Sequence, residues 1–278
     1  MLKDDVIRAL EDVRPAPVSG QALADRFGVS RNAVWKVIHQ LMEEGHKIAS
    51  VRAGYYLEEG SDRFTEPGIR RFLPPGCPIA IETYDTIDST NNEAKRRIGA
   101  GDSRDLLLVS ETQTAGRGRM GHSFYSPEGS GIYMTLSIEL GKPLYQPERI
   151  TLAAAVAVVR AVEPFLSEEL RLKWVNDIFY KGKKVCGILS EGITDLETGL
   201  IQHAIVGIGL NVRPLSFPVD LEGIAGSLEL MQPTRNEIVG RIVTELLSLY
   251  GALDSDAFLE EYLSRSMHPE KVRQELSR

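Results

Sequence analysis

The stretch ETQTAGRGRMGHSFYSPEGSGIYMTL, residues 111–136, decides the fold of the larger part of the chain. Three of its glycines match G-x-G-x-x-G, a spacing found in dinucleotide-binding folds and kinase glycine loops. A dinucleotide fingerprint lies between a strand and a helix. Here the strand-like run DLLLVSET (105–112) is followed by a Pro/Gly-rich segment and a second strand-like run, IYMTLSIEL (132–140). The pattern therefore predicts two strands joined by a glycine-rich loop. The sequence also lacks the H-R-D, D-F-G and G-x-x-x-x-G-K-[ST] motifs, which excludes a kinase and a P-loop protein.

The spacers of this loop include Arg117 and Arg119. Glycine lets a backbone move and approach a ligand closely, whereas arginine stays charged and pairs bidentately with carboxylates and phosphates. The combination predicts a mobile loop that binds an anion.

Composition sets outer limits on the function. At 278 residues, with 42% hydrophobic and 26% charged residues, the chain is typical of a globular protein of two or more domains. The net charge of −7 means that any affinity for DNA must come from a local patch. Cys77 and Cys186 form no metal-binding or disulfide spacing, the first residues are unlike a signal peptide, and the most apolar run (150–162) is too short to span a bilayer. These features predict a cytoplasmic protein that does not enter a membrane.

Residues 1–62 are predicted to form a winged helix-turn-helix. An amphipathic helix over 4–13 precedes two more helices, of which the first ends at Gly28 in a left-handed conformation and the second is capped by Ser30. The segment HKIASVRAGYYLEEG (46–60) follows as two short strands, the wing.

We expect the winged helix to bind operator DNA, because the second helix of this fold enters the major groove. Between residues 26 and 52 there are five basic residues and two acidic ones, a small excess that predicts weak binding by one copy and hence a homodimer on a two-fold site. The alternative is a winged helix used only for protein contacts. The predicted DNA-binding residues are Ser30, Arg31, Asn32, Trp35, Lys36 and Arg52.

Three further segments carry polar groups at places where a ligand could bind. DSTN (88–91) lies at a strand–helix junction, where hydroxyls either cap the helix or bind a polar ligand. RLKWVNDIFYKGKKVCGILSEG (171–192) reads as strand, turn, strand; its lysines could be a solvated cluster at the turn, and Asp177 a plain turn residue. HAIVGIGLNV (203–212) reads as a buried strand whose glycines let a ligand come close.

The motifs DSTN, QTAGRGRMG, KWVND, KKVCGIL and GIGLNV, in this order behind a winged helix, resemble the bifunctional biotin protein ligase and biotin operon repressor family, from residue 1 to about 265. The resemblance implies an α/β (α+β) architecture: a linker over 63–80, then a class II synthetase-like biotin/lipoate ligase domain over 81–265, with a mixed sheet and helices on one side. It also implies that biotin and ATP form biotinyl-5'-AMP, with Mg²⁺, and that the biotin passes to a lysine of a biotin carboxyl carrier protein.

The resemblance also assigns roles to residues. Lys184, Arg117 and Arg119 would be catalytic, and Asp177 would lie near Mg²⁺. Biotin would contact Ser89, Thr90, Asn91, Gln113, Gly116, Arg117, Gly118, Arg119, Lys184 and Gly187. The nucleotide would contact Arg119, Phe124, Asn176, Lys184 and Asn211.

The sequence departs from the family pattern at a few places. Val175 replaces the proline of K-W-P-N-D, and Phe124 stands where tryptophan is common. The family adds an SH3-like barrel after the last helices, whereas only MHPEKVRQELSR follows here, so we expect the barrel to be absent or truncated and residues 266–278 to form a short tail. The rival functions are a lipoate or octanoyl ligase on the same scaffold, a non-catalytic biotin-sensing repressor, and a winged-helix regulator with an unrelated sensor domain.

Overall fold

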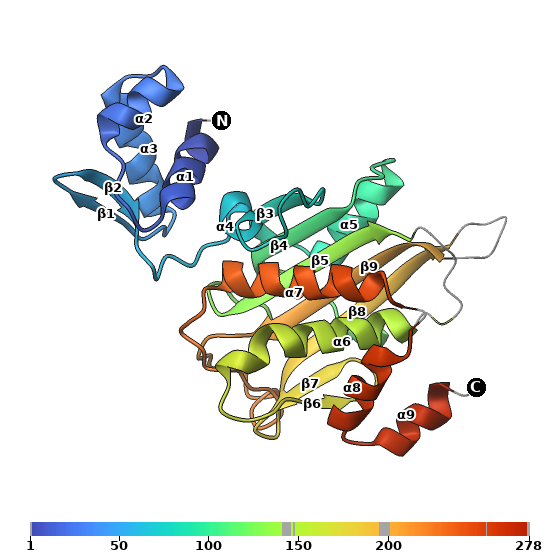
Figure 1. Ribbon diagram of the computed structural model, residues 1–278. Helices are drawn as coiled ribbons and strands as arrows, with labels where there is room; N and C mark the ends of the chain where they lie inside the picture. Colours follow the sequence, from blue (N-terminus) through green and yellow to red (C-terminus); the bar gives the residue numbers. More distant parts are fainter. Residues whose placement is uncertain (1, 141–145, 147, 195–200, 254, 277–278) are drawn as a thin grey trace.

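The computed structural model describes residues 2–140, 146, 148–194, 201–253 and 255–276. Figure 1 shows a small N-terminal unit (blue) joined by an extended segment to a larger domain built around one twisted sheet. In the part of the chain that is described, no helix is both long enough and apolar enough to cross a membrane.

The N-terminal unit confirms the predicted winged helix-turn-helix. Its helices are α1 (Leu2–Val13), α2 (Gly20–Phe27) and α3 (Arg31–Glu43), and its wing is the antiparallel hairpin of β1 (Ile48–Val51) and β2 (Gly54–Leu57). Gly28 ends α2 with a φ of 65°, and the Ser30 hydroxyl accepts a hydrogen bond from the backbone N–H of Ala33 at 3.2 Å. The apolar faces of the three helices and the wing form a small core of their own.

The segment that joins the two units packs tightly against the larger domain. It contains the short helix α4 (Glu66–Arg70), which also contacts α1. Phe64, Ile69, Leu73 and Ile79 are buried in the main core. The predicted linker over 63–80 is therefore fixed along much of its length.

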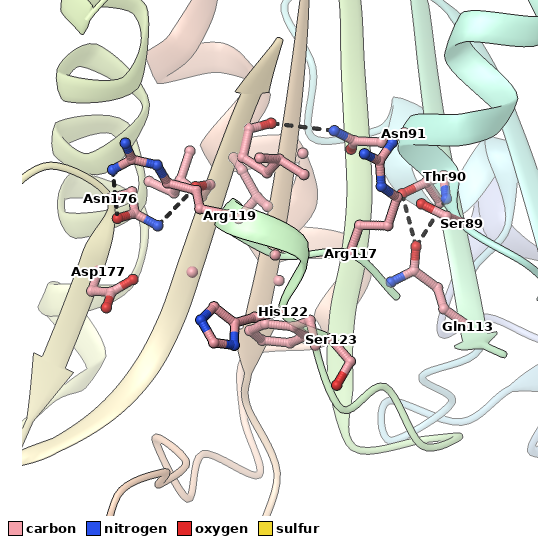
Figure 2. A pocket seen from close by; sticks show the side chains of 18 of the residues that line it. Ser89, Thr90, Asn91, Gln113, Arg117, Arg119, His122, Ser123, Asn176 and Asp177 are labelled. Atoms are coloured by element: carbon pink, nitrogen blue, oxygen red, sulfur yellow. Dashed lines mark hydrogen bonds between the residues drawn. The ribbon is translucent and has the colours of Figure 1, made fainter. Parts of the chain in front are cut away.

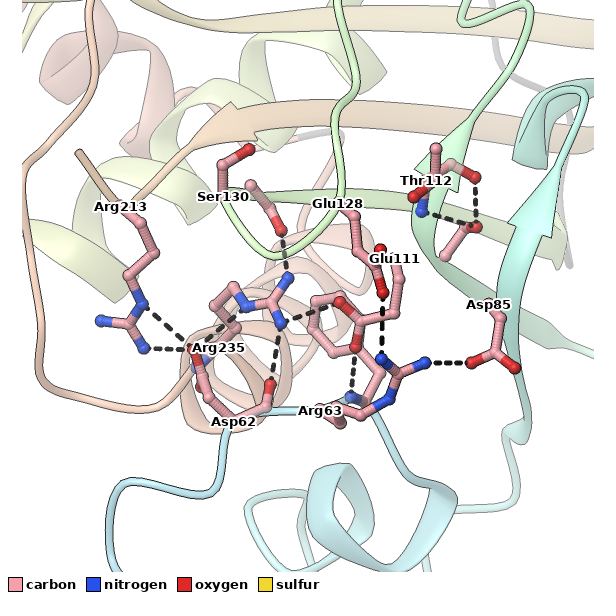
Figure 3. A network of polar contacts seen from close by, with 12 residues as sticks. Asp62, Arg63, Asp85, Glu111, Thr112, Glu128, Ser130, Arg213 and Arg235 are labelled. Carbon is pink, nitrogen blue, oxygen red and sulfur yellow. Dashed lines mark hydrogen bonds and ion pairs between the residues drawn. The ribbon is translucent and has the colours of Figure 1, made fainter. Parts of the chain in front are cut away.

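A buried ionic network holds the start of this segment (Figure 3). Arg235, at the start of helix α7 (Arg235–Tyr250), is 2% exposed and lies 2.8 Å from Glu111 and 3.0 Å from Asp62. Arg213 pairs with the same Asp62, and Glu111 also accepts a hydrogen bond from the backbone of Phe64 at 2.8 Å. The network ties the connection between the two units to strands of the sheet.

The larger domain confirms the predicted mixed sheet. Its described strands are β3 (Ala80–Ile87), β4 (Leu106–Gln113), β5 (Gly131–Glu139), β6 (Arg171–Lys173), β7 (Asp177–Tyr180), β8 (Lys183–Thr194) and β9 (Ile201–Asn211). They are arranged in the order β3-β4-β5-β9-β8-β7-β6. The β3–β4 pair is parallel and the remaining pairs are antiparallel.

The helices do not all lie on one side of the sheet, so that expectation was wrong. Helices α6 (Glu148–Val162), α7 and α8 (Ala257–Arg265) pack on one face, while α5 (Thr90–Gly99) contacts β4, β5 and β9 on the other. Alternation along β4 shows the two faces, because Leu107 and Val109 join the main core whereas Leu106 and Leu108 pack under α5. The predicted tail contains helix α9 (Pro269–Leu276), and Val272 on that helix is buried in the main core; residues 277 and 278 lie outside the described residues.

Candidate functional site

A cavity of about 300 Å³ lies on the face of the sheet that carries α5. Its walls come from the N-terminus of α5, the end of β4, the Gly/Arg loop between β4 and β5, the start of β7, and strands β8 and β9. Figure 2 shows the side chains around it. The segments singled out in the sequence, far apart along the chain, therefore meet at one place.

The floor of the cavity depends on glycine. A Cβ at Gly209 would lie 2.5 Å from the ring of Phe124, and one at Gly207 would lie 2.0 Å from Asn91 Oδ1. Gly187 lines the same floor on β8, with Phe124 3.3 Å from its missing Cβ. Because these positions lack side chains, the sheet leaves room on this face for the ring of Phe124, the amide of Asn91 and the cavity itself.

Hydroxyl and amide groups line one end of the cavity. Ser89 caps α5, accepting from the N–H of Asn92, and the next residue, Thr90, donates its N–H to Gln113 Oε1 at 2.9 Å. Gln113 in turn donates from Nε2 to Ser126 Oγ at 3.1 Å. The structure confirms that Ser89 caps the helix, and it places Ser89, Thr90 and Asn91 at the cavity, where binding of a polar ligand stays a prediction.

Thr135 on β5, which sequence reasoning missed, supports this end from below. It is fully buried, and its Oγ1 lies 2.7 Å from Thr90 Oγ1 and donates to Asn91 Oδ1 at 2.6 Å. A threonine inside an apolar strand gives no sequence signal of such a role, because its partners lie more than 40 positions away. His122, Met134 and Leu189 are further lining residues that we did not predict.

The two loop arginines reach opposite walls of the cavity (Figure 2). Arg117 donates to Asn92 Oδ1 at 3.0 Å beside α5, whereas Arg119 donates to Asn176 Oδ1 at 3.3 Å beside β7. Met120, which follows Arg119, has a φ of 54° inside a short 3-10 turn (Arg119–Gly121). Both guanidiniums are at least partly exposed, so they remain available to an anion.

Lys184 and Asp177 form an ion pair at the other end of the cavity. Lys184 Nζ lies 2.7 Å from Asp177 Oδ1, across the hairpin of β7 and β8. Asp177 is thus the first residue of a strand and faces the cavity, so it is not a plain turn residue. The tip of the hairpin is formed by Lys181 and Gly182, both with positive φ. Lys181 and Lys183 near the tip are exposed, whereas Lys184 is half-buried.

The residues around Asp177 do not form a metal site by themselves. No group of three or more His, Cys, Asp or Glu side chains within the described ranges could hold a metal ion. Asp177 offers a single carboxylate, which Lys184 already contacts. Such a site suits Mg²⁺ only where phosphates and water supply most of its ligands.

Two of the predicted ligand residues do not line the cavity. Asn211 is 5% exposed and donates from Nδ2 to the carbonyl of Gly226 at 2.9 Å, so it holds the segment after β9. Gly116 is buried, and a Cβ there would lie 2.4 Å from the carbonyl oxygen of Phe124. Its role in this structure is to let the two arms of the loop pair closely.

The predicted DNA-binding residues gather on one side of the winged helix. Arg31, Asn32 and Trp35 of α3 and Arg52 of the wing line one groove. Trp35 is 48% exposed and contacts His39, with ring centroids 4.1 Å apart and ring planes tilted by 47°. Lys36 is exposed beside this groove, whereas the Ser30 hydroxyl is engaged in capping α3.

Comparison with known proteins gives consistent matches to both units. Residues 84–211 match the "Biotin/lipoate A/B protein ligase family" and residues 3–56 match an "HTH domain" family. The chain is 38% identical over 231 residues to the "Bifunctional ligase/repressor BirA" of Bacillus spizizenii, covering 82% of this chain and 70% of that protein. It is 29% identical over 251 residues to the protein of the same name from Escherichia coli, covering 89% and 76%. Among solved structures, "Biotin protein ligase from Aquifex aeolicus in complex with biotin and ATP" superimposes with a TM-score of 0.57 at 26% identity, covering 68% of this chain and 78% of that one.

Proposed function

The chain belongs to the family of bifunctional biotin ligase/repressors, and from that premise we propose that it activates biotin with ATP to biotinyl-5'-AMP and transfers the biotin to a lysine of a biotin carboxyl carrier protein. We further propose that it represses biotin genes through its winged helix and acts in the cytoplasm, where thiols such as Cys77 and Cys186 stay reduced.

The observation that carries the proposal is the arrangement of cations around one cavity. Arg119 and Lys184 line the end beside β7, Arg117 lies against the α5 wall, and hydroxyl and amide groups form the end at Thr90 and Gln113. Biotin has the matching layout, because its neutral ureido ring is joined by an apolar chain to a carboxylate. We assign the ring to the end at Thr90 and Gln113 and the carboxylate to the end at Lys184.

The reaction explains why cations are needed at that end. The biotin carboxylate attacks the α-phosphorus of ATP, and pyrophosphate leaves, so two anions must come into contact. At about 4 Å their repulsion is about 4 kcal/mol for an effective dielectric of about 20. Fixed cations offset this repulsion and stabilise the charge that develops in the transition state, so no covalent nucleophile from the protein is required.

The loop and the metal would complete the site. The Gly/Arg loop can close over the mixed anhydride and exclude water from it. Mg²⁺ would accompany the phosphates of ATP and neutralise part of their charge, with Asp177 as the protein carboxylate that we propose faces it. Its pairing with Lys184 keeps that carboxylate from repelling the phosphates.

Biotin-dependent exchange of labelled pyrophosphate into ATP tests the proposed activity. We expect exchange with biotin and none with lipoate or octanoate. Exchange with lipoate in place of biotin would support the rival ligase on the same scaffold, and no exchange with either acid would support a non-catalytic sensor.

We expect Arg119→Ala to release biotinyl-5'-AMP faster, by about tenfold, because a loop that closes over a ligand mainly slows its escape. Arg119 lies on the loop and, among the described residues, is held to the opposite wall by a hydrogen bond to Asn176, so its removal detaches that side of the loop. The measurement is the off-rate of prebound adenylate after dilution into excess unlabelled adenylate. Arg104→Ala is the control, because Arg104 is exposed, pairs with Asp102 and does not line the cavity. An unchanged off-rate in Arg119→Ala would mean that its guanidinium is merely solvated.

Operator binding is the second function, and the groove between α3 and the wing supports it. We expect Arg31→Ala to weaken binding to a fragment from upstream of the biotin genes about tenfold or more, the range of one good base contact. Lys3→Ala is the matched control, since Lys3 pairs with Glu44 and does not line the groove. We also expect tighter binding with biotin and ATP present, through a homodimer. Equal affinities of the wild type and Arg31→Ala in a DNA titration would exclude Arg31 from the contact, whereas no binding by the wild type would leave the winged helix as a protein-contact module.

A further inference from the structure

Glu191 on β8 lies just behind the cavity and joins three of the elements around it. Its Oε1 lies 2.6 Å from Lys95 Nζ on α5 and 3.7 Å from Arg117 Nη2 on the Gly/Arg loop. Its Oε2 accepts a hydrogen bond from Asn91 Nδ2 at 3.0 Å. Glu191 does not itself line the cavity, whereas Asn91 and Arg117 do, so any effect it has on a ligand there is exerted through them.

The contact with Asn91 fixes which way that amide points. Both hydrogens of Nδ2 are used, one by Glu191 and the other by the carbonyl of Leu189 at 3.3 Å. Oδ1 accepts from Thr135, in the space that Gly207 leaves free. The amide therefore has no hydrogen to give to a ligand, and Asn91 shapes the wall of the cavity in one fixed orientation.

The charge on Glu191 offsets two cations next to the cavity. Burial by itself would raise the pKa of the Glu191 carboxyl, but the hydrogen bonds from Lys95 and Asn91 outweigh burial and hold the pKa below its usual value. The side chain is thus an anion at neutral pH. Among the described side chains that contact Glu191, only Arg117 belongs to the loop, and Arg117 is also held by Asn92.

We propose that Glu191 is a positioning residue for biotin binding: it restrains the Arg117 guanidinium against the α5 wall, so that this arginine is already oriented when biotin enters. This inference rests on the proposed ligase function and deepens it. A free arginine side chain has many rotamers, and binding a ligand then costs the entropy of fixing one of them. The carboxylate of Glu191 removes part of that cost before biotin arrives.

Glu191→Gln tests the proposal, because it keeps the size and an oxygen acceptor but removes the charge. We expect the KM for biotin to rise about tenfold while kcat and the KM for ATP change by less than about threefold, since the restraint acts on binding and not on the groups at the α-phosphate. Glu93→Gln is the matched control: Glu93 pairs with Arg96 and Arg97 on the same helix and does not line the cavity. Glu93→Gln should leave all three parameters unchanged.

A double-mutant cycle separates positioning from a general structural role. We expect Glu191→Gln to weaken the calorimetric Kd for biotin in the wild-type chain but to have no further effect once Arg117 is alanine, because the two changes remove one interaction. An undiminished effect in the Arg117→Ala background would place the action of Glu191 on Asn91 or Lys95 and overturn the proposal. An unchanged or lowered biotin KM in Glu191→Gln would also overturn it. Failure of the ligase function itself is distinguishable, because the wild type and Glu93→Gln would then show no biotin-dependent exchange.

Discussion

Replacing Lys184 with alanine is expected to slow formation of biotinyl-5'-AMP by about 100-fold or more, the scale of one fixed electrostatic contact in a transition state. Lys184 is the cation that we place between the biotin carboxylate and the α-phosphate. Lys184 Nζ lies 2.7 Å from Asp177 Oδ1, so its removal also leaves the Asp177 carboxylate without this balancing charge, beside two incoming anions. The variant therefore loses an attraction and gains a repulsion.

The measurement is biotin-dependent pyrophosphate exchange at saturating ATP. Lys181→Ala is the control for loss of a lysine from the same hairpin, since Lys181 is exposed at its tip. Adding Asp177→Asn to Lys184→Ala removes the unpaired carboxylate, and we expect it to recover part of the lost rate. Near-normal exchange in Lys184→Ala would refute the assignment, whereas a loss that Asp177→Asn leaves unchanged would mean that the lost attraction accounts for the whole effect.

Local signals predicted the elements of the fold well, because the physical causes lie within a few residues. The turn at Gly28 needs a positive φ, and the cap at Ser30 needs only the N–H three residues later. The Gly/Arg loop was recognisable as a loop between strands for the same reason. Its two arginines were visible in the sequence, but their divergence to opposite walls was not, since it depends on Asn92 and Asn176.

The side of the sheet on which α5 lies could not be predicted from the helix itself. Ala94 and Ile98 form an apolar face on α5, which predicts that the helix packs on a sheet but not on which side of it. The face is set by the crossover from β3 to the adjacent parallel strand β4, because such crossovers are right-handed. The helix on this connection therefore packs opposite α6 and α7, and its N-terminus brings Thr90 and Asn91 to the glycine floor.

Contacts between residues far apart in the sequence were the other feature that could not be predicted. Glu191 and Asn91 are separated by 100 positions, and Glu111 and Arg235 by 124. A single sequence contains no sign of such pairs, because each member alone resembles an ordinary charged or polar residue in a strand or helix. Asn211, which the resemblance assigns to the nucleotide, does not line the cavity and instead holds the chain at Gly226.

Replacing Arg235 with alanine is expected to destabilise the larger domain by about 3–5 kcal/mol, the cost of leaving a buried charge without its partner. Arg235 is 2% exposed, pairs with Glu111, which is equally buried, and donates to the carbonyl of Gly131 at 2.9 Å. Its guanidinium also stacks over the ring of Phe64 at 4.4 Å. Without Arg235, Glu111 keeps its hydrogen bond from the backbone N–H of Phe64 but loses its ion-pair partner at 2.8 Å, so it must stay charged in the core or bind a proton.

Urea unfolding measures the effect, and the positions of the two tryptophans let each unit be followed separately. In a Trp35→Phe background, tryptophan fluorescence comes from Trp174, which packs against the main core. We expect Arg235→Ala to lower the midpoint of that transition strongly, and Arg241→Ala to shift it little, because Arg241 forms an exposed i,i+4 pair with Glu237 on the same helix. Adding Glu111→Gln to Arg235→Ala should restore part of the loss, since the unpaired carboxylate is then absent. Equal, small shifts for Arg235→Ala and Arg241→Ala would show that the buried network contributes no more than a surface pair.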